Sequence, residues 1–254
     1  MSLIENLFNR IILLLLIFIS IGCTEKPNTY DSKNFINQDP IDASFQNDMN
    51  RLNSLQKAAN QGNADAQNSL GLMYIKGQGV IQNDAKAFEL FNKAANQGNA
   101  DAQNNLGLMY IKGLGVIQDD AKAFELFNKA ASQGNAIAQY TLGFMYDHGK
   151  GIEQDYEKAV EWYKKSANQG YDLAQNNLGV KYTEGQGVAK NIALANEWFL
   201  KAANGGNNMA QLNIGLSYLD GSNGLPENRA IAIKWLKKAA DQGNAHAKLI
   251  LDGL

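Results

Sequence analysis

A period of 36 residues runs through most of this 254-residue chain. Residues 60–95 and 96–131 differ at only three aligned positions, which are Ser69/Asn105, Gln78/Leu114 and Asn83/Asp119. The same frame continues through 132–167, 168–203 and, with one inserted residue near Ser222, 204–240. A period of this length predicts a stacked array, because one such unit cannot bury its apolar face without its neighbours.

Each repeat contains two blocks in which apolar residues follow helical spacing. The first repeat shows them as Ala66, Leu70, Met73 and Tyr74, then as Ala87, Leu90, Phe91, Ala94 and Ala95. Such spacing predicts two amphipathic helices per repeat. The fold class expected is therefore all-α, with antiparallel helix pairs in five full repeats and capping helices at 43–59 and 243–254.

Short polar residues and glycines divide the blocks. Five residues are placed to accept hydrogen bonds at the N-terminus of a second helix: Asn83, Asp119, Asp155, Asn191 and Asn228. Glycines such as Gly77 are placed to end the first helices.

Three sets of residues recur inside the helices and suggest packing roles. A glycine such as Gly71 costs a helix about 1 kcal/mol relative to alanine, so its recurrence predicts close approach of the paired helix. The larger residues expected to fill the wider gaps are Leu90, Leu126, Trp162, Trp198 and Trp235. The glutamines expected to form hydrogen bonds between adjacent repeats are Gln67, Gln103, Gln139, Gln175 and Gln211.

The repeat pattern A-x3-LG-x-MY-x2-G-x-GV, followed by a capped helix ending in KAA-x-QG, resembles the Sel-one-like repeat (SLR), a relative of the tetratricopeptide repeat. The resemblance covers residues 60–240 and departs from the pattern at Lys181 and Ser217, which replace the Met of MY. It implies a right-handed α-solenoid of antiparallel helix pairs, and it implies adaptor roles in which the helical surface binds a protein or peptide.

The composition provides few groups for catalysis or metal binding. The net charge of −2 gives no basic field for nucleic acid. One cysteine and two histidines in different repeats, His148 and His246, predict neither a metal site nor a disulfide framework. The Gly-x-Gly loops follow helices rather than strands, which disfavours a phosphate-binding role. We expect no enzyme activity and no cofactor.

The N-terminus has the pattern of an export signal. Arg10 precedes 14 uncharged residues, 11–24, whereas a membrane span needs about 20 and a signal peptide needs roughly 7 to 15. Residues 20–23, ending in Gly22 and Cys23, resemble the bacterial lipobox, which implies cleavage of a signal peptide at 1–22 and a covalent lipid on Cys23. The alternative is that Cys23 is an ordinary apolar residue of a membrane segment.

The polar segment after the cysteine is expected to act as a flexible tether over residues 23–42. The resemblance to lipoproteins implies export and anchoring to the cell envelope, facing the periplasm. The residue after the cysteine is Thr24 rather than Asp. In this respect the sequence resembles lipoproteins that are sorted to the outer membrane, which applies if the host has two membranes. The repeats, 43–254, would then be held beside a bilayer.

Partner-binding residues are predicted on the face of each first helix opposite its apolar stripe, because that face is concave in tetratricopeptide arrays. This expectation names eight residues: Asn68, Asn104, Tyr140, Phe144, Asn176, Asn177, Leu212 and Asn213. Their amides would pair with an extended peptide beside an apolar floor. The alternative is that these amides are simply solvated and that the apolar residues pack against the next repeat.

The sequence thus predicts a non-enzymatic protein-interaction scaffold anchored by lipid in a bacterial envelope. A second hypothesis is a periplasmic immunity lipoprotein that neutralises a secreted toxin, a role in which SLR lipoproteins also occur. A remote third is an enzyme acting on cell-wall or β-lactam substrates.

Overall fold

The computed structural model describes residues 43–221 and 224–254, with side chains from residue 49 onward. This described part contains twelve helices and no strand, which confirms the all-α prediction. The predicted signal peptide, Cys23 and the tether lie outside the described residues, as does Ser222. No helix of the described part is both long enough and apolar enough to cross a membrane.

The helices follow one another with short connections, and all but the first and last contain 13 residues. Their bounds are α2 Ala43–Asn60, α3 Ala64–Lys76, α4 Asp84–Asn96, α5 Ala100–Lys112, α6 Asp120–Ser132, α7 Ala136–His148, α8 Tyr156–Asn168, α9 Asp172–Glu184, α10 Ile192–Asn204, α11 Asn208–Asp220, α12 Arg229–Asp241 and α13 Ala245–Asp252. The predicted capping segments correspond to α2 and α13.

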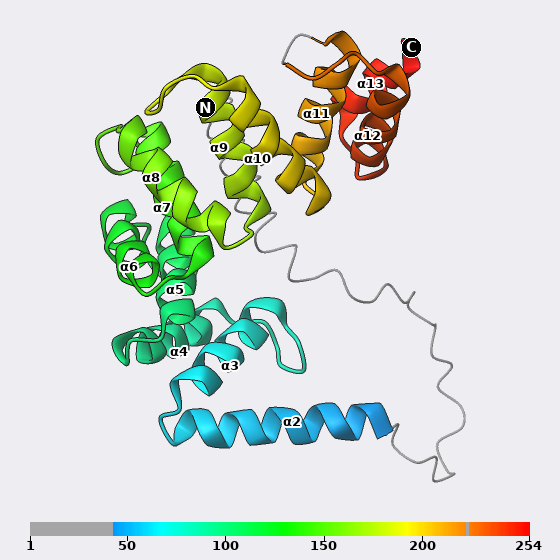
Figure 1. Ribbon diagram of the computed structural model, residues 1–254. Helices are drawn as coiled ribbons and strands as arrows, with labels where there is room; N and C mark the ends of the chain where they lie inside the picture. The colour runs from blue at the N-terminus through cyan, green and yellow to red at the C-terminus, as the bar shows by residue number, and fades with distance from the viewer. Residues whose placement is uncertain (1–42, 222–223) are drawn as a thin grey trace. The chain divides into compact units, whose positions relative to one another are not determined.

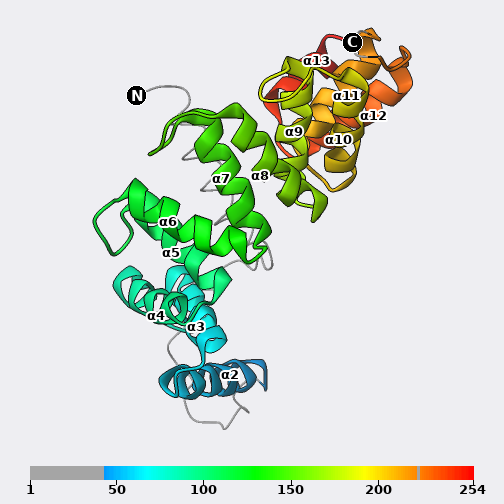
Figure 2. The same cartoon turned by 60° about the vertical axis from the view of Figure 1, so that its left-hand side comes forward.

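The chain divides into two compact units. Unit 1 includes α2 to α4 and residues 112–118, unit 2 includes α6 to α13, and α5 contributes residues to both. In unit 1, α3 packs against α2 and α4, and in unit 2 each of α7 to α12 packs against the next helix. Figures 1 and 2 both show α7 and α8 side by side.

Polar caps determine where the helices begin. Each predicted cap of a second helix accepts a hydrogen bond from the backbone N–H three residues later, as Asn83 does from Lys86 at 3.0 Å. These bonds satisfy N–H groups that have no partner inside the helix. Gly77 ends α3 with φ of 65°, a left-handed conformation that favours glycine.

The glycine inside each first helix lies against an aromatic or leucine side chain of the second helix. A Cβ added to Gly71 would lie 2.6 Å from the Phe91 ring, and one added to Gly143 would lie 2.6 Å from the Tyr163 ring. The prediction of close helix approach is confirmed.

The large residues predicted to fill the wider gaps between helices are less buried than the residues that directly follow them. The fully buried side chains are Phe91, Phe127, Tyr163 and Leu236, with Phe199 6% exposed. The preceding residues are only half-buried, and among them the Trp162 ring carries the Lys165 ammonium at 3.8 Å from its centre. Phe91, a member of the predicted apolar stripe, is the residue that lies over Gly71, and Leu90 packs against the same core from its edge.

The recurring glutamines link neighbouring repeats through hydrogen bonds. The Gln139 side chain donates to the Ala131 carbonyl at 3.1 Å and accepts from the Gln169 side chain at 2.7 Å. Gln67 in unit 1 and Gln211 in unit 2 make the same two bonds. The predicted role between repeats is confirmed for these glutamines.

Candidate functional site

The structure buries most of the residues predicted to bind a partner. Five of the eight are exposed by 9% or less: Asn68, Asn104, Tyr140, Phe144 and Leu212. The other three are half-buried: Asn176, Asn177 and Asn213. These first five residues cannot form a binding surface as predicted, because they offer a partner almost no exposed area.

Tyr140 and Phe144 are buried because neighbouring rings cover them. The Tyr140 ring lies 5.9 Å from that of Tyr163 and 5.3 Å from that of Tyr171. Burial raises the pKa of the Tyr140 hydroxyl above its ordinary value. The Phe144 ring is stacked on the His148 ring at 4.0 Å. The Tyr140–Tyr171 contact is of the kind expected in the alternative, in which side chains of this face pack against the next repeat, whereas His148 lies on the same helix as Phe144.

The three half-buried asparagines form a chain of hydrogen bonds with one another. Asn213 donates to Asn176 at 3.2 Å, Asn176 donates to Asn177 at 3.4 Å, and Asn177 donates to the Tyr163 hydroxyl at 3.2 Å. These donors are occupied within unit 2, so they connect successive first helices. A peptide could pair with the amides only through their remaining groups.

A buried ion pair lies next to this chain, and the sequence analysis did not predict it. The Lys181 ammonium donates to Asp147 Oδ1, and both side chains are 7% exposed or less. The signal was present in the repeats: Asp147 stands where earlier repeats have Ile75 and Ile111, and Lys181 replaces a methionine. Two charges entering the apolar positions of adjacent repeats indicate a pair.

The ion pair is well supplied with hydrogen bonds. Tyr163 donates to Asp147 Oδ2 at 3.2 Å, and Lys181 donates to Gln186 Oε1 at 2.7 Å. The Lys181 ammonium also lies 4.9 Å from the centre of the Tyr156 ring. The pair therefore joins α7 to α9, with both charges supplied with further hydrogen bonds inside unit 2.

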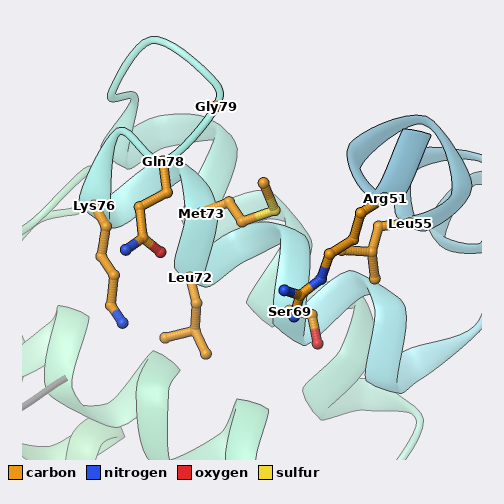
Figure 3. A pocket seen from close by; sticks show the side chains of 8 residues that line it. All are labelled: Arg51, Leu55, Ser69, Leu72, Met73, Lys76, Gln78 and Gly79. Atoms are coloured by element: carbon orange, nitrogen blue, oxygen red, sulfur yellow. The ribbon is translucent and has the colours of Figure 1, made fainter. Parts of the chain in front are cut away.

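A pocket of about 590 Å³ opens on the first-helix face of unit 1 (Figure 3). Its lining residues come from α2, from α3 and from the loop after α3: Arg51, Leu55, Ser69, Leu72, Met73, Lys76, Gln78 and Gly79. Ser69 and Leu72 lie on the face on which we predicted partner binding. The volume lies within the range of about 300–1,000 Å³ that ligand pockets occupy.

A smaller pocket of about 210 Å³ lies in unit 2 between α9, α10 and α11. Its lining residues are Val180, Thr183, Glu184, Ile192, Asn196, Phe199, Asn213, Leu216 and Ser217. Val180, Asn213 and Leu216 lie on the predicted face. Each unit therefore has a recess that includes residues of the predicted face, and the recess in unit 2 includes Asn213, one of the eight residues predicted to bind a partner.

The described residues hold no cluster of three or more His, Cys, Asp or Glu side chains that could bind a metal. His148 is exposed, and its ring Nδ1 lies 3.1 Å from the Phe144 carbonyl oxygen. The two pockets can offer a ligand apolar contact, hydrogen bonds and charge. These are the interactions by which a pocket recognises a ligand.

Helix pairs joined by capped turns, glycine-to-ring contacts and glutamine bridges define a helical repeat array. The sequence profile of the Sel1 repeat matches residues 55–63, 64–99, 100–135, 136–171, 172–207 and 208–244. The chain belongs to the Sel1 repeat family. The five full-length matched stretches have the same period as the repeats described above, and each begins four residues after the corresponding repeat.

Solved structures of the same family show the same fold. A Sel1 repeat protein from Oxalobacter formigenes is 33% identical with a TM-score of 0.73, over 83% of this chain and 86% of that one. The protective antigen c5321 of uropathogenic Escherichia coli is 33% identical with a TM-score of 0.57, over 79% of this chain and 50% of that one. Within each unit, consecutive helix pairs pack as in a Sel1 repeat solenoid.

A third relative has a stated role. The immunity protein Pa5087 of Pseudomonas aeruginosa is 25% identical with a TM-score of 0.50, over 72% of this chain and 67% of that one. Comparison with curated protein sequences gave no match. Sel1 repeat proteins are protein-interaction scaffolds.

Proposed function

We propose that this protein is a non-enzymatic scaffold that binds a protein partner at its two pockets, each of which is lined in part by residues of the predicted first-helix face. The observation that carries the proposal is that both recesses include residues of the face predicted from the repeat pattern. Family membership supports a binding role. A recess that receives side chains of a partner supplies the buried contacts on which affinity depends.

Cross-linking and capture with the full-length tagged protein test this proposal. Leu72→Ser and Leu216→Ser place a hydroxyl in each pocket, whereas Ile81→Ser changes an isoleucine that is 91% exposed and lines neither pocket. We expect one partner to be captured by the wild type and by Ile81→Ser, and lost from one of the pocket variants. A partner that all three variants retain, or no specific partner, would contradict binding at these pockets.

We also propose that the protein is exported and anchored to the bacterial envelope by lipid on Cys23, with the repeats in the periplasm and the anchor in the outer membrane if the host has two membranes. The support is the apolar run that ends at the lone cysteine. Several acyl chains anchor stably, at about 0.8 kcal/mol per buried CH₂. Labelling cells with palmitate should mark the wild type in the membrane fraction. Equal labelling of Cys23→Ser would refute the assignment.

An immunity role is a second candidate, favoured by the similarity to the Pseudomonas aeruginosa immunity protein. An immunity protein must bind its toxin tightly enough to block it, whereas an adaptor can bind weakly. If a gene for a secreted lipase or nuclease lies beside this one, co-expression of the two should restore growth that the toxin alone prevents. Growth arrest in both cultures would leave the adaptor role.

A further inference from the structure

The pocket of unit 2, between α9, α10 and α11, has apolar walls and a single charged group, which is a carboxylate. Its apolar lining residues are Val180, Ile192, Phe199 and Leu216. The carboxylate belongs to Glu184, an exposed residue that is the last of α9. None of the lining residues is basic, so the pocket presents a ligand with one negative charge beside apolar surface.

The position of Glu184 strengthens this negative charge. The first two repeats have Lys76 and Lys112 at the same position, the last residue of the helix. The C-terminal end of a helix carries a partial negative charge, which favours a cation there and disfavours a carboxylate. The other charged residue in the last turn of α9, Lys181, is paired with Asp147. Glu184 takes part in no ion pair of the described residues, so a cationic ligand would improve the electrostatics of this helix end.

The uncharged polar groups of the pocket donate their hydrogen atoms within the protein. The Thr183 hydroxyl donates to the Gly179 carbonyl at 2.9 Å, and the Ser217 hydroxyl donates to the Asn213 carbonyl at 3.0 Å. The Asn213 side chain donates to Asn176 Oδ1 at 3.2 Å. A hydroxyl has one hydrogen to donate, so a ligand that forms a hydrogen bond with Thr183 must itself be the donor.

These properties together describe the ligand that the pocket suits. It needs a positive charge for Glu184, several N–H donors and an apolar stem. An arginine side chain has all three, because its guanidinium carries five donors and no acceptor, and its methylene stem packs on apolar surface. The volume of about 210 Å³ is below the range of about 300–1,000 Å³ for small-molecule pockets, and this size suits a single side chain.

We propose that the pocket of unit 2 binds an arginine side chain of the partner protein. The stem packs against Val180, Ile192 and Leu216, and the guanidinium donates to the Glu184 carboxylate and to the Thr183 hydroxyl. The inference rests on the proposed scaffold function and names the chemistry of the partner at this pocket.

Lysine is the less suitable cation for this pocket. Its ammonium is a compact and strongly hydrated point charge, whereas the planar guanidinium can donate to two acceptors at once and is more weakly hydrated. The acceptors of the adjacent residues Thr183 and Glu184 therefore favour arginine. A lysine peptide is kept as a comparison in the test.

Fluorescence anisotropy with the full-length protein in detergent tests the proposal. The probe is a labelled octapeptide of alternating Arg and Ser, and its matched controls have citrulline or Lys in place of Arg. Citrulline keeps the shape of arginine without its charge. Glu184→Gln removes the pocket charge, and Thr183→Val removes the hydroxyl acceptor. Glu197→Gln removes an exposed carboxylate of α10 outside the pocket.

We expect the Arg peptide to bind and the citrulline peptide to bind at least tenfold more weakly. Glu184→Gln should raise the Kd by about tenfold, since a hydrogen bond between charged groups contributes about that factor. Thr183→Val should raise the Kd by roughly threefold, and Glu197→Gln should leave it within about twofold. No binding of the Arg peptide, equal affinity for the citrulline or the Lys peptide, or an equal loss with Glu197→Gln would overturn the proposal.

Two further outcomes would also refute the inference, and one of them separates it from the scaffold proposal. If free arginine binds more tightly than the Arg peptide, the pocket binds a small molecule and the inference fails. If a partner is captured from cells equally by the wild type and by the Thr183→Val/Glu184→Gln protein, the scaffold function stands and the inference fails.

Discussion

Removing one charge of the buried ion pair should destabilise the protein more than removing both. Lys181→Met restores the methionine that three other repeats have at this position and leaves the Asp147 carboxylate buried without its cation. Breaking a buried pair from one side costs about 3–5 kcal/mol. We therefore expect the free energy of unfolding of unit 2 to fall by that amount.

The double variant Asp147→Ile/Lys181→Met should recover most of this loss, because each new residue occurs at the same position in an earlier repeat. Two costs remain, since Gln186 loses its Lys181 donor and the buried Tyr163 hydroxyl loses its Asp147 acceptor. An orphaned buried donor costs about 1–3 kcal/mol. Adding Tyr163→Phe, the residue found in repeats one, two and four, removes that donor. This change also removes the acceptor of the Asn177 amide, so the triple variant should remain less stable than the wild type by about 1–3 kcal/mol.

Urea denaturation followed by circular dichroism measures these differences, and hydrogen exchange of the α7 to α9 amides locates them. Exchange is needed because repeat arrays do not always unfold in one step. If Lys181→Met proves as stable as the wild type, the reasoning about an uncompensated charge is wrong. If the double variant loses as much as the two single variants combined, the two residues do not act as a pair.

Three further outcomes follow from contacts described above. Gly71→Ala should destabilise unit 1 in urea by about 1–3 kcal/mol through overlap with the Phe91 ring, and Phe91→Leu should relieve part of the loss. Gln139→Leu leaves the partner carbonyl in the preceding repeat without its donor, and should cost about 1–3 kcal/mol by the same measurement. The Asp155 carboxylate has a lowered pKa because the Lys158 backbone N–H and then its side chain donate to it. The contribution of the Asp155 carboxylate to stability is present above the ordinary Asp pKa and is lost as the pH falls through the lowered pKa. Asp155→Asn should therefore flatten the decline in stability below about pH 4. An unchanged pH profile of stability would contradict this.

Most of the fold could be predicted from the sequence because the repeat shows the same local signals five times. Caps such as Asn83, the helix-ending Gly77, the internal Gly71 and the bridging Gln139 each act through contacts within one repeat or with its neighbour. A signal repeated at a fixed spacing averages out local ambiguity. The spacing did not predict which of two adjacent apolar residues, such as Leu90 and Phe91, would be the more fully buried, because both lie on the apolar face of the helix.

The candidate site was less predictable because it depends on departures from the repeat. Which face of a helix reaches solvent depends on the size of neighbouring side chains, and Tyr171 replaces a capping asparagine and covers Tyr140. Lys181 appeared in the sequence only as a departure from the pattern, and its partner lies 34 residues earlier in the chain. The pocket of unit 1 needed Arg51 of α2, a helix outside the five full repeats.

The glutamine bridges and the ion pair differ in whether they tolerate the gain or loss of whole 36-residue repeats. The bridges differ along the chain, because Gly205 stands where the other repeats have the second glutamine of the bridge. The first two repeats are nearly identical and include Gln67 and Gln97, which form such a bridge, so duplication or loss of 36 residues there yields a chain whose repeats still fit together. Loss of residues 148–183 would instead bring Ser217 to the place of Lys181 and leave Asp147 without a cation. The array can therefore change its length by recombination near its beginning, while the pair fixes the order of its later repeats.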